Sequence, residues 1–154
     1  LVVKAARQRA EESNGPAAAI QLNDANHTII TGKTSELLGA SSALLLNALK
    51  HLAGIADDVR MISPTVLEPV CKLKTGALGH RNPRLHTDEV LVALSICAIT
   101  DENAQKALDK LPELKNCEVH TSVILSQTDE RVFRRLGVNL TQEAKYQTSK
   151  LYHQ

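Results

Sequence analysis

The sequence predicts an α/β or α+β layer fold, with one mixed sheet of about four strands flanked by helices. Two observations support this prediction. Segments with helical and strand-like patterns alternate along the chain, and two short β-prone runs near its start form a hairpin pattern. The sequence contains neither an internal repeat nor a low-complexity linker. We therefore expect residues 17–154 to form a single domain.

The first expected elements are a helix and a hairpin. Residues 1–13 are rich in good helix formers, and Asn14-Gly15-Pro16 ends this helix. Because the chain does not begin with Met, we expect residues 1–16 to lead in from a missing N-terminal part of a longer protein. The hairpin joins Ala17–Leu22 to His27–Thr31 through a loop of Asn and Asp residues at 23–26.

Two further helices are long and strongly apolar. One spans Ala40–Ala53 and ends at Gly54, and the other begins at Thr87 or Asp88 and ends at Ile99. The remaining expected elements are a strand at 59–63, an irregular helix at 65–72, a loop at 73–87, a helix from 101 to 112, a strand at 117–125 and a helix capped by Thr128 or Asp129 that ends at 136. The tail from 138 to 154 has no clear period.

The two apolar helices predict either a sheet that is covered on both sides or an exposed apolar surface. A helix that is apolar on nearly every face is normally buried. Either the sheet is covered on both sides, or one helix packs on something outside this chain. In the second case we expect an exposed apolar patch or a subunit interface. The expected partners are the missing N-terminal domain and a second copy of the chain in a homo-oligomer.

Composition excludes several classes of function. The formal net charge is only +1, and aromatic residues make up 2%, so we expect no nucleic-acid partner. The longest apolar runs are far shorter than the ~20 residues of a membrane helix, so we expect no membrane partner. The odd cysteine count, 3, and the lack of a CxxC pair favour a reduced, cytoplasmic location.

The first candidate for chemistry is the loop after the hairpin. Thr31-Gly32-Lys33-Thr34-Ser35 looks like the end of a phosphate-binding P-loop, but the first glycine of that motif is replaced by His27. Lys33, Thr34 and Ser35 remain candidates for anion binding in another geometry. A plain polar loop is an equally good interpretation.

The second candidate opens the helix at 40–53. Small residues at Gly39-Ala40-Ser41-Ser42 would let an anion approach the free N–H groups of the helix N-terminus. Ordinary N-capping by Ser41 or Ser42 is the alternative, and it needs no ligand.

The third candidate is the basic segment from 72 to 86. It contains Lys72, Lys74, His80, Arg81, Arg84 and His86, and no acidic residue. Arginine suits bidentate recognition of carboxylate or phosphate, although a solvated basic loop is an equally good interpretation. His86 beside Asp88 and Glu89 is a candidate general acid/base. The sequence lacks HExxH and close His/Cys spacing, so we expect no metal site.

Four blocks of the chain resemble a large bacterial family known as domain of unknown function 1846. They are Thr31–Ser35 with Leu38–Lys50, then Asn82–Leu91, His120–Ser126 and Tyr146–His153. Members are much longer, so the resemblance implies that this chain is their C-terminal part. It implies little about activity. It adds Asn82 to the anion-binding candidates and keeps His120 as a possible neighbour of the site, although a lone strand histidine is more often structural.

The leading hypothesis is a cytoplasmic bacterial domain that contributes a phosphate- or carboxylate-binding surface to a larger enzyme. The anion would be held by Lys33, Thr34, Ser35, Ser41, Ser42, Asn82 and Arg84. His86, with Asp88 or Glu89, would be the acid/base group. The alternative is a non-catalytic docking or oligomerisation domain. The sequence identifies no cofactor or substrate. The first hypothesis requires Lys33, Ser41, Arg84 and His86 to converge on one cleft.

Overall fold

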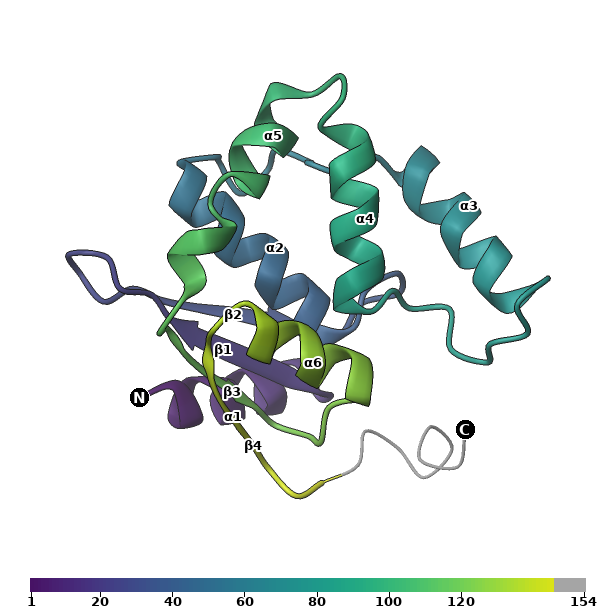
Figure 1. Ribbon diagram of the computed structural model, residues 1–154. Coiled ribbons are helices and arrows are strands. Elements are labelled where there is room, and N and C mark those ends of the chain that lie inside the picture. The colour runs from purple at the N-terminus through teal and green to yellow at the C-terminus, as the bar shows by residue number, and fades with distance from the viewer. Residues whose placement is uncertain (146–154) are drawn as a thin grey trace.

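The computed structural model describes residues 1–145 and confirms the predicted fold class (Figure 1). The elements in chain order are α1 Val2–Ser13, β1 Ala17–Gln21, β2 Ile29–Lys33, α2 Ala40–Ala53, α3 Pro64–Thr75, α4 Thr87–Cys97, α5 Glu102–Leu108, the 3-10 helix η1 Leu111–Leu114, β3 Glu118–Thr121, α6 Gln127–Arg135 and β4 Asn139–Gln142.

One mixed sheet of four strands, in the order β2-β1-β3-β4, organises the fold. The predicted hairpin is present, and β1 pairs antiparallel with β2 in the register Ala19↔Thr31. β1 also pairs antiparallel with β3, whereas β3 and β4 run parallel. The run of three buried alanines at the start of β1 lets helices approach this central strand closely from both sides.

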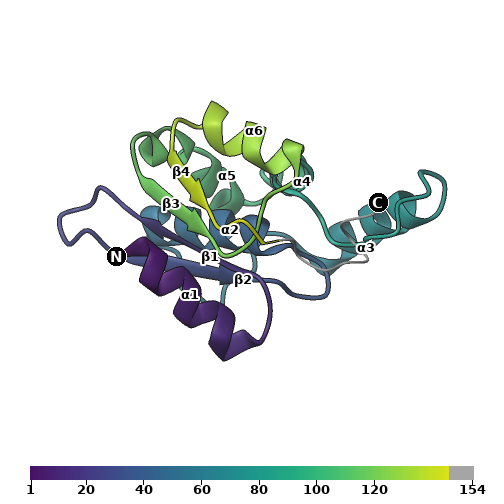
Figure 2. The same ribbon diagram turned by 90° about the horizontal axis from the view of Figure 1, so that it is seen from below.

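Helices cover both faces of the sheet. Within residues 1–145, α1 is the helix on one face, where it packs against β1, β2 and β3 and buries Ala6 (Figure 2). On the other face, α2 packs on β1 and β2, and α6 packs on β4. α4 and α5 pack on these helices, so the main core lies between the sheet and the α2 layer. α3 stands at the outside, next to α4 (Figure 1).

Two strand predictions fail for physical reasons. Residues 59–63 form no strand: the chain bends at Met61 and Ile62, and Ser63 caps α3, accepting a hydrogen bond from the Thr65 N–H. The predicted strand at 117–125 is correct only for its first half, since β3 ends at Thr121. The fourth strand is instead β4, which lies in the segment that showed no period.

The ends of several helices also differ from prediction. α4 begins after His86, which takes the N-cap position expected for Thr87 or Asp88. α6 is capped by the Ser126 side chain, not by Thr128 or Asp129. α2 ends as predicted, with Gly54 in the left-handed conformation at φ 70°.

The two apolar helices have different surroundings. α2 buries Leu44, Leu45 and Leu49 inside the domain. α4 buries Val90 and Leu94 but leaves other apolar side chains exposed, as the sequence predicted for a helix without a polar face.

Candidate functional site

Three strands end at the same edge of the sheet, and the candidate site lies at this edge. β2 and β3 are both antiparallel to β1, and β4 is parallel to β3, so their carboxyl ends point the same way. α2 follows β2 and α6 follows β3, which brings the N-termini of both helices to this edge. In open α/β sheets, ligands bind outside the carboxyl ends of the strands.

A small pocket opens at this edge. Its volume is about 30 Å³, which is enough for one or two waters or one polar group of a ligand. The walls come from the sheet edge and from the starts of three helices: Pro16, Ala17, Ala18, Thr34, Gly39, Ala40, Ser41, Asn82, Arg84, His86, Thr121, Val123, Leu125 and Asp129.

Gly32 sets the position of α2 beside the pocket. A Cβ atom at Gly32 would lie 2.3 Å from the Leu44 backbone N and 2.8 Å from the Ala40 carbonyl O. Only glycine therefore lets the first turns of α2 lie directly against β2. The glycine of the Gly-Lys-Thr sequence thus serves helix packing in this fold.

The two polar loops predicted from the sequence lie side by side. The Leu85 N–H donates to the Leu37 carbonyl at 2.8 Å, and Arg84 Nε donates to the Ser35 carbonyl at 2.6 Å. Ser42 Oγ donates to the Leu85 carbonyl at 2.8 Å, which joins α2 to the same segment. These bonds hold the basic segment against the start of α2.

Several polar groups of the pocket remain available to a ligand. Ser41 lines the pocket although it is only 4% exposed. The N-cap of α2 is Gly39, so no side chain caps the first N–H groups of this helix. Asn82 accepts the Arg84 N–H through Oδ1 at 3.1 Å, which leaves its amide nitrogen as a donor.

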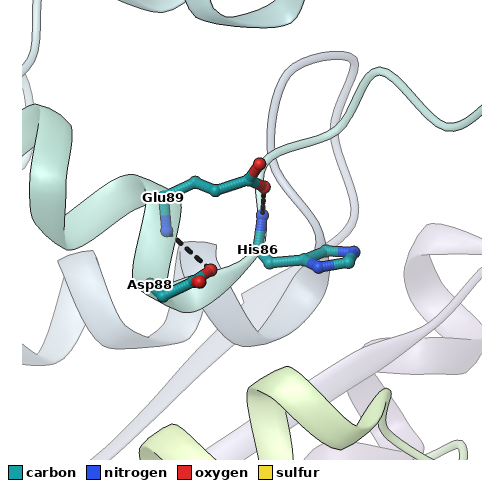
Figure 3. Close-up of side chains that lie close together, drawn as sticks. All are labelled: His86, Asp88 and Glu89. Atoms are coloured by element: carbon teal, nitrogen blue, oxygen red, sulfur yellow. Dashed lines mark hydrogen bonds between the residues drawn. The ribbon is translucent and has the colours of Figure 1, made fainter. Parts of the chain in front are cut away.

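His86, Asp88 and Glu89 lie together at the start of α4. The atoms that they could offer to a metal ion lie within 4.8 Å of one another. Among the three residues drawn in Figure 3, each carboxylate bonds to backbone: Glu89 Oε1 accepts the His86 N–H and Asp88 Oδ1 accepts the Glu89 N–H, both at 2.8 Å. Both carboxylates therefore satisfy first-turn N–H groups of α4 or its cap.

A buried lysine engages Glu89 further. Lys74 Nζ donates to Glu89 Oε1 at 2.8 Å and also to the Arg84 carbonyl. Partial burial alone would raise the pKa of Glu89, but the hydrogen bonds from the His86 N–H and from Lys74 outweigh it and lower the pKa. A carboxylate whose pKa is lowered and that is bound to an ammonium group is a poor proton acceptor. This geometry supports a structural role for Glu89.

Comparison with known proteins assigns the chain to a family. The family model described as "Domain of unknown function DUF1846, C-terminal" matches residues 1–152. The chain belongs to this family. The resemblance inferred from the sequence is thereby confirmed, although its last block, Tyr146–His153, lies outside the described residues.

The DUF1846 relatives are bacterial UPF0371 proteins. One from Corynebacterium aurimucosum is 61% identical over 92% of this chain and 28% of its own length. One from Corynebacterium diphtheriae is 57% identical over 99% of this chain and 30% of its own length. One from Clostridioides difficile is 48% identical over 90% of this chain and 27% of its own length. The chain thus spans less than a third of the relatives that it matches. Across residues 1–145, no helix has the length and apolar character needed to cross a membrane.

Some predicted site residues of this DUF1846 domain lie outside the pocket. Lys33 is exposed at the end of β2, and Ser35 contributes its carbonyl to Arg84 rather than a side chain to the pocket. Ser42 bonds to Leu85. His120 faces α1, where its ring contacts Thr141 Oγ1 at 2.7 Å and Glu143 Oε2 at 3.1 Å. Ser41, Asn82, Arg84, His86 and Thr34 do line the pocket.

The sequence analysis missed two residues that build the site. Asp129 lines the pocket and accepts hydrogen bonds from Thr87, and Lys74 anchors Glu89 and Arg84. The sequence indicated Asp129 only as a possible cap of a helix. It indicated Lys74 only as one member of the basic segment from 72 to 86. Their partners lie too far along the chain for spacing to indicate them.

Proposed function

We propose that this domain binds a small anionic group, a phosphate or a carboxylate, in the pocket at the strand ends, as part of a larger cytoplasmic enzyme. Ser41 carries the proposal. Ser41 lines the pocket and is only 4% exposed. A nearly buried hydroxyl beside a pocket can donate a hydrogen bond to a ligand oxygen or to a water.

Arg84 supplies the positive charge of the proposed site. Its Nε donates to the Ser35 carbonyl at 2.6 Å, and Arg84 is one of the residues that line the pocket. Because a guanidinium is rigid and planar, a fixed Nε also orients the two terminal NH₂ groups. These groups form the fork that binds two oxygens of a phosphate or carboxylate. The uncapped first turn of α2 adds N–H donors.

His86 and Asp129 are two further polar residues of the pocket. Asp129 is negatively charged when ionised, so the bound molecule is expected to present a hydrogen-bond donor, such as a hydroxyl, toward it. We assign His86 as the proton donor or acceptor of the proposed enzyme, because it is the histidine that lines the pocket. Asp88 and Glu89 lie outside the pocket lining and have no part in the proposed proton transfer.

Titration calorimetry with inorganic phosphate tests the proposal directly. The variants are Arg84→Lys, which keeps the charge but loses the fork, and Ser41→Ala, which removes the hydroxyl. We expect Arg84→Lys to bind phosphate about tenfold more weakly, which corresponds to about 1.4 kcal/mol. Ser41→Ala should weaken binding by a similar factor.

The matched control is Arg81→Lys. Arg81 is an exposed arginine of the same segment that does not line the pocket, so this variant should bind phosphate like the wild type. Thermal unfolding of each variant verifies that it is folded. If wild type and Arg84→Lys bind phosphate equally, or neither binds it, the basic segment is a solvated surface and the anion site is wrong.

A further inference from the structure

A groove separates α3 from α4 on the outside of the domain. The two helices run antiparallel, as the ion pair between Lys74 in the last turn of α3 and Glu89 in the first turn of α4 shows. At their other ends, the helices line an open groove of about 410 Å³. Pro64 and Val66 of α3 face this groove together with Ile96 and Cys97 of α4. Figure 1 shows α3 as the outermost helix, beside α4.

Apolar side chains flank the groove in two stripes. On α4, Val92 and Ile96 are spaced by four residues and therefore share one helix face, and Ile99 follows shortly after the helix ends at Cys97. Val92 is 60% exposed, Ile96 51% and Ile99 80%. On α3, Val66 and Leu73 share a face in the same way, and Leu73 is largely exposed. Val66 and Ile96, one member of each stripe, line the groove.

The exposed apolar side chains include a group on α4 and just after it. Within residues 1–145, three of the seven exposed large hydrophobic side chains are Val92, Ile96 and Ile99. Exposed apolar surface that gathers in one place indicates an interaction site, whereas scattered single residues do not. Two helices that offer apolar stripes on either side of a groove suit an amphipathic helix as the occupant.

We propose that the α3–α4 groove docks a helix from the part of the full-length protein that precedes this domain. The chain covers 30% of the Corynebacterium diphtheriae relative, and the family model that it matches is a C-terminal one. In a protein of that length, most of the polypeptide lies before this domain. A segment on the same chain binds at a high effective concentration, which favours it over a second copy. The proposal is independent of the anion pocket.

Photocrosslinking in the full-length protein tests this proposal. A photoreactive amino acid replaces Val92, whose side chain is largely exposed, so the fold tolerates the change. We expect an internal crosslink that mass spectrometry maps to a residue preceding this domain. Ile96→Asp should abolish this crosslink, because a carboxylate in an apolar contact is strongly unfavourable.

The matched control places the same group at Ile124, which is exposed just before α6 and away from the groove. It should give no crosslink to the same site, and Ile124→Asp should leave the crosslink from position 92 intact. A crosslinked dimer from position 92 would show that a second copy occupies the groove. The absence of any crosslink outside this domain would show that no other segment of the protein occupies the groove. Either result overturns the proposal, whereas neither bears on phosphate binding.

Discussion

Asp129, in the first turn of α6, accepts two hydrogen bonds from Thr87 through one carboxylate oxygen. The Thr87 N–H donates to Oδ1 at 2.9 Å and the Thr87 hydroxyl donates to it at 2.7 Å. Both residues are buried. This pair joins the start of α6 to the start of α4, so it holds together two of the three helices whose N-termini surround the pocket. The negative charge also lies at the positive end of the α4 dipole.

Replacement of Asp129 by alanine should destabilise the domain strongly. Asp129→Ala leaves the buried N–H and hydroxyl of Thr87 without a partner, and each such group costs about 1–3 kcal/mol. We expect the free energy of unfolding in urea to fall by about 3 kcal/mol. Asp129→Asn keeps an acceptor oxygen and should lose less. Asp58→Ala, at an exposed aspartate, is the control and should change stability by no more than about 0.5 kcal/mol. Equal losses for Asp129→Ala and the control would contradict this account.

The Lys74–Glu89 pair should respond unequally to removal of its two members. The Lys74 side chain is 2% exposed, whereas the Glu89 side chain is 28% exposed and can reach water. Glu89→Gln leaves a buried ammonium without a counter-charge, so we expect a loss of about 3–5 kcal/mol. Lys74→Met leaves a carboxylate that water and the His86 N–H still stabilise, so the loss should be about half as large.

Chemical denaturation of the two single variants measures this difference. Lys72→Met, at an exposed lysine of the same helix, is the control for loss of a positive charge on α3. Its unfolding free energy should match that of the wild type. If Lys74→Met proves the more damaging variant, burial of the ammonium is not what dominates the energetics of the pair.

Local sequence patterns predicted the elements whose causes are local. The β1–β2 hairpin follows from two β-prone runs around a loop of Asn and Asp residues, and α2 ends where Gly54 takes a left-handed conformation. β4 has no such local cause. It is a short strand that pairs parallel to β3. This pairing requires a crossover connection, which α6 provides, so it depends on tertiary structure and not on the local sequence.

The candidate site was predictable to a similar extent. Loop polarity and helix starts indicated Ser41, Arg84 and His86, and these residues do line one pocket. Asp129 and Lys74 act through partners 42 and 15 residues away, which no local spacing indicates. Lys33 was selected for its place after Gly32, but the physical role of Gly32 is close packing of α2, so the Gly-Lys-Thr sequence does not bring that lysine to the pocket.

Asp24 should make stability depend on pH in the acid range. The Thr28 hydroxyl and N–H donate to its carboxylate at 2.6 and 2.8 Å, and these bonds lower the pKa of Asp24 from 3.8 to about 2. Because the folded pKa lies below the ordinary value, the ionised carboxylate stabilises the fold above pH 3.8. This contribution is lost as the pH falls toward about 2.

Nuclear magnetic resonance titration of the Asp24 carboxyl group measures the pKa directly. Thr28→Val removes the hydroxyl donor, so the pKa of Asp24 should rise toward 3.8. In the same variant, and in Asp24→Asn, unfolding free energy should vary less with pH between about 2 and 4 than in the wild type. A pKa that stays at about 2 in Thr28→Val would show that the hydroxyl is not the main cause.

Gly32 should tolerate no side chain at all. The alanine Cβ would lie 2.3 Å from the Leu44 backbone N, and a backbone atom cannot move aside as a flexible side chain does. We expect Gly32→Ala to lose about 3 kcal/mol or more in urea unfolding, at the upper end of the cost of overpacking. Gly15→Ala is the matched control, because a Cβ at Gly15 meets nothing within 4 Å. It should be neutral or slightly stabilising.

Since Gly32 also fixes the start of α2, Gly32→Ala should shift the backbone amide resonances of Ala40 and Ser41 and weaken phosphate binding, whereas Gly15→Ala should do neither. A Gly32→Ala variant as stable as the wild type would mean that α2 has room to move away from β2, and that the pocket beside it is not rigidly formed.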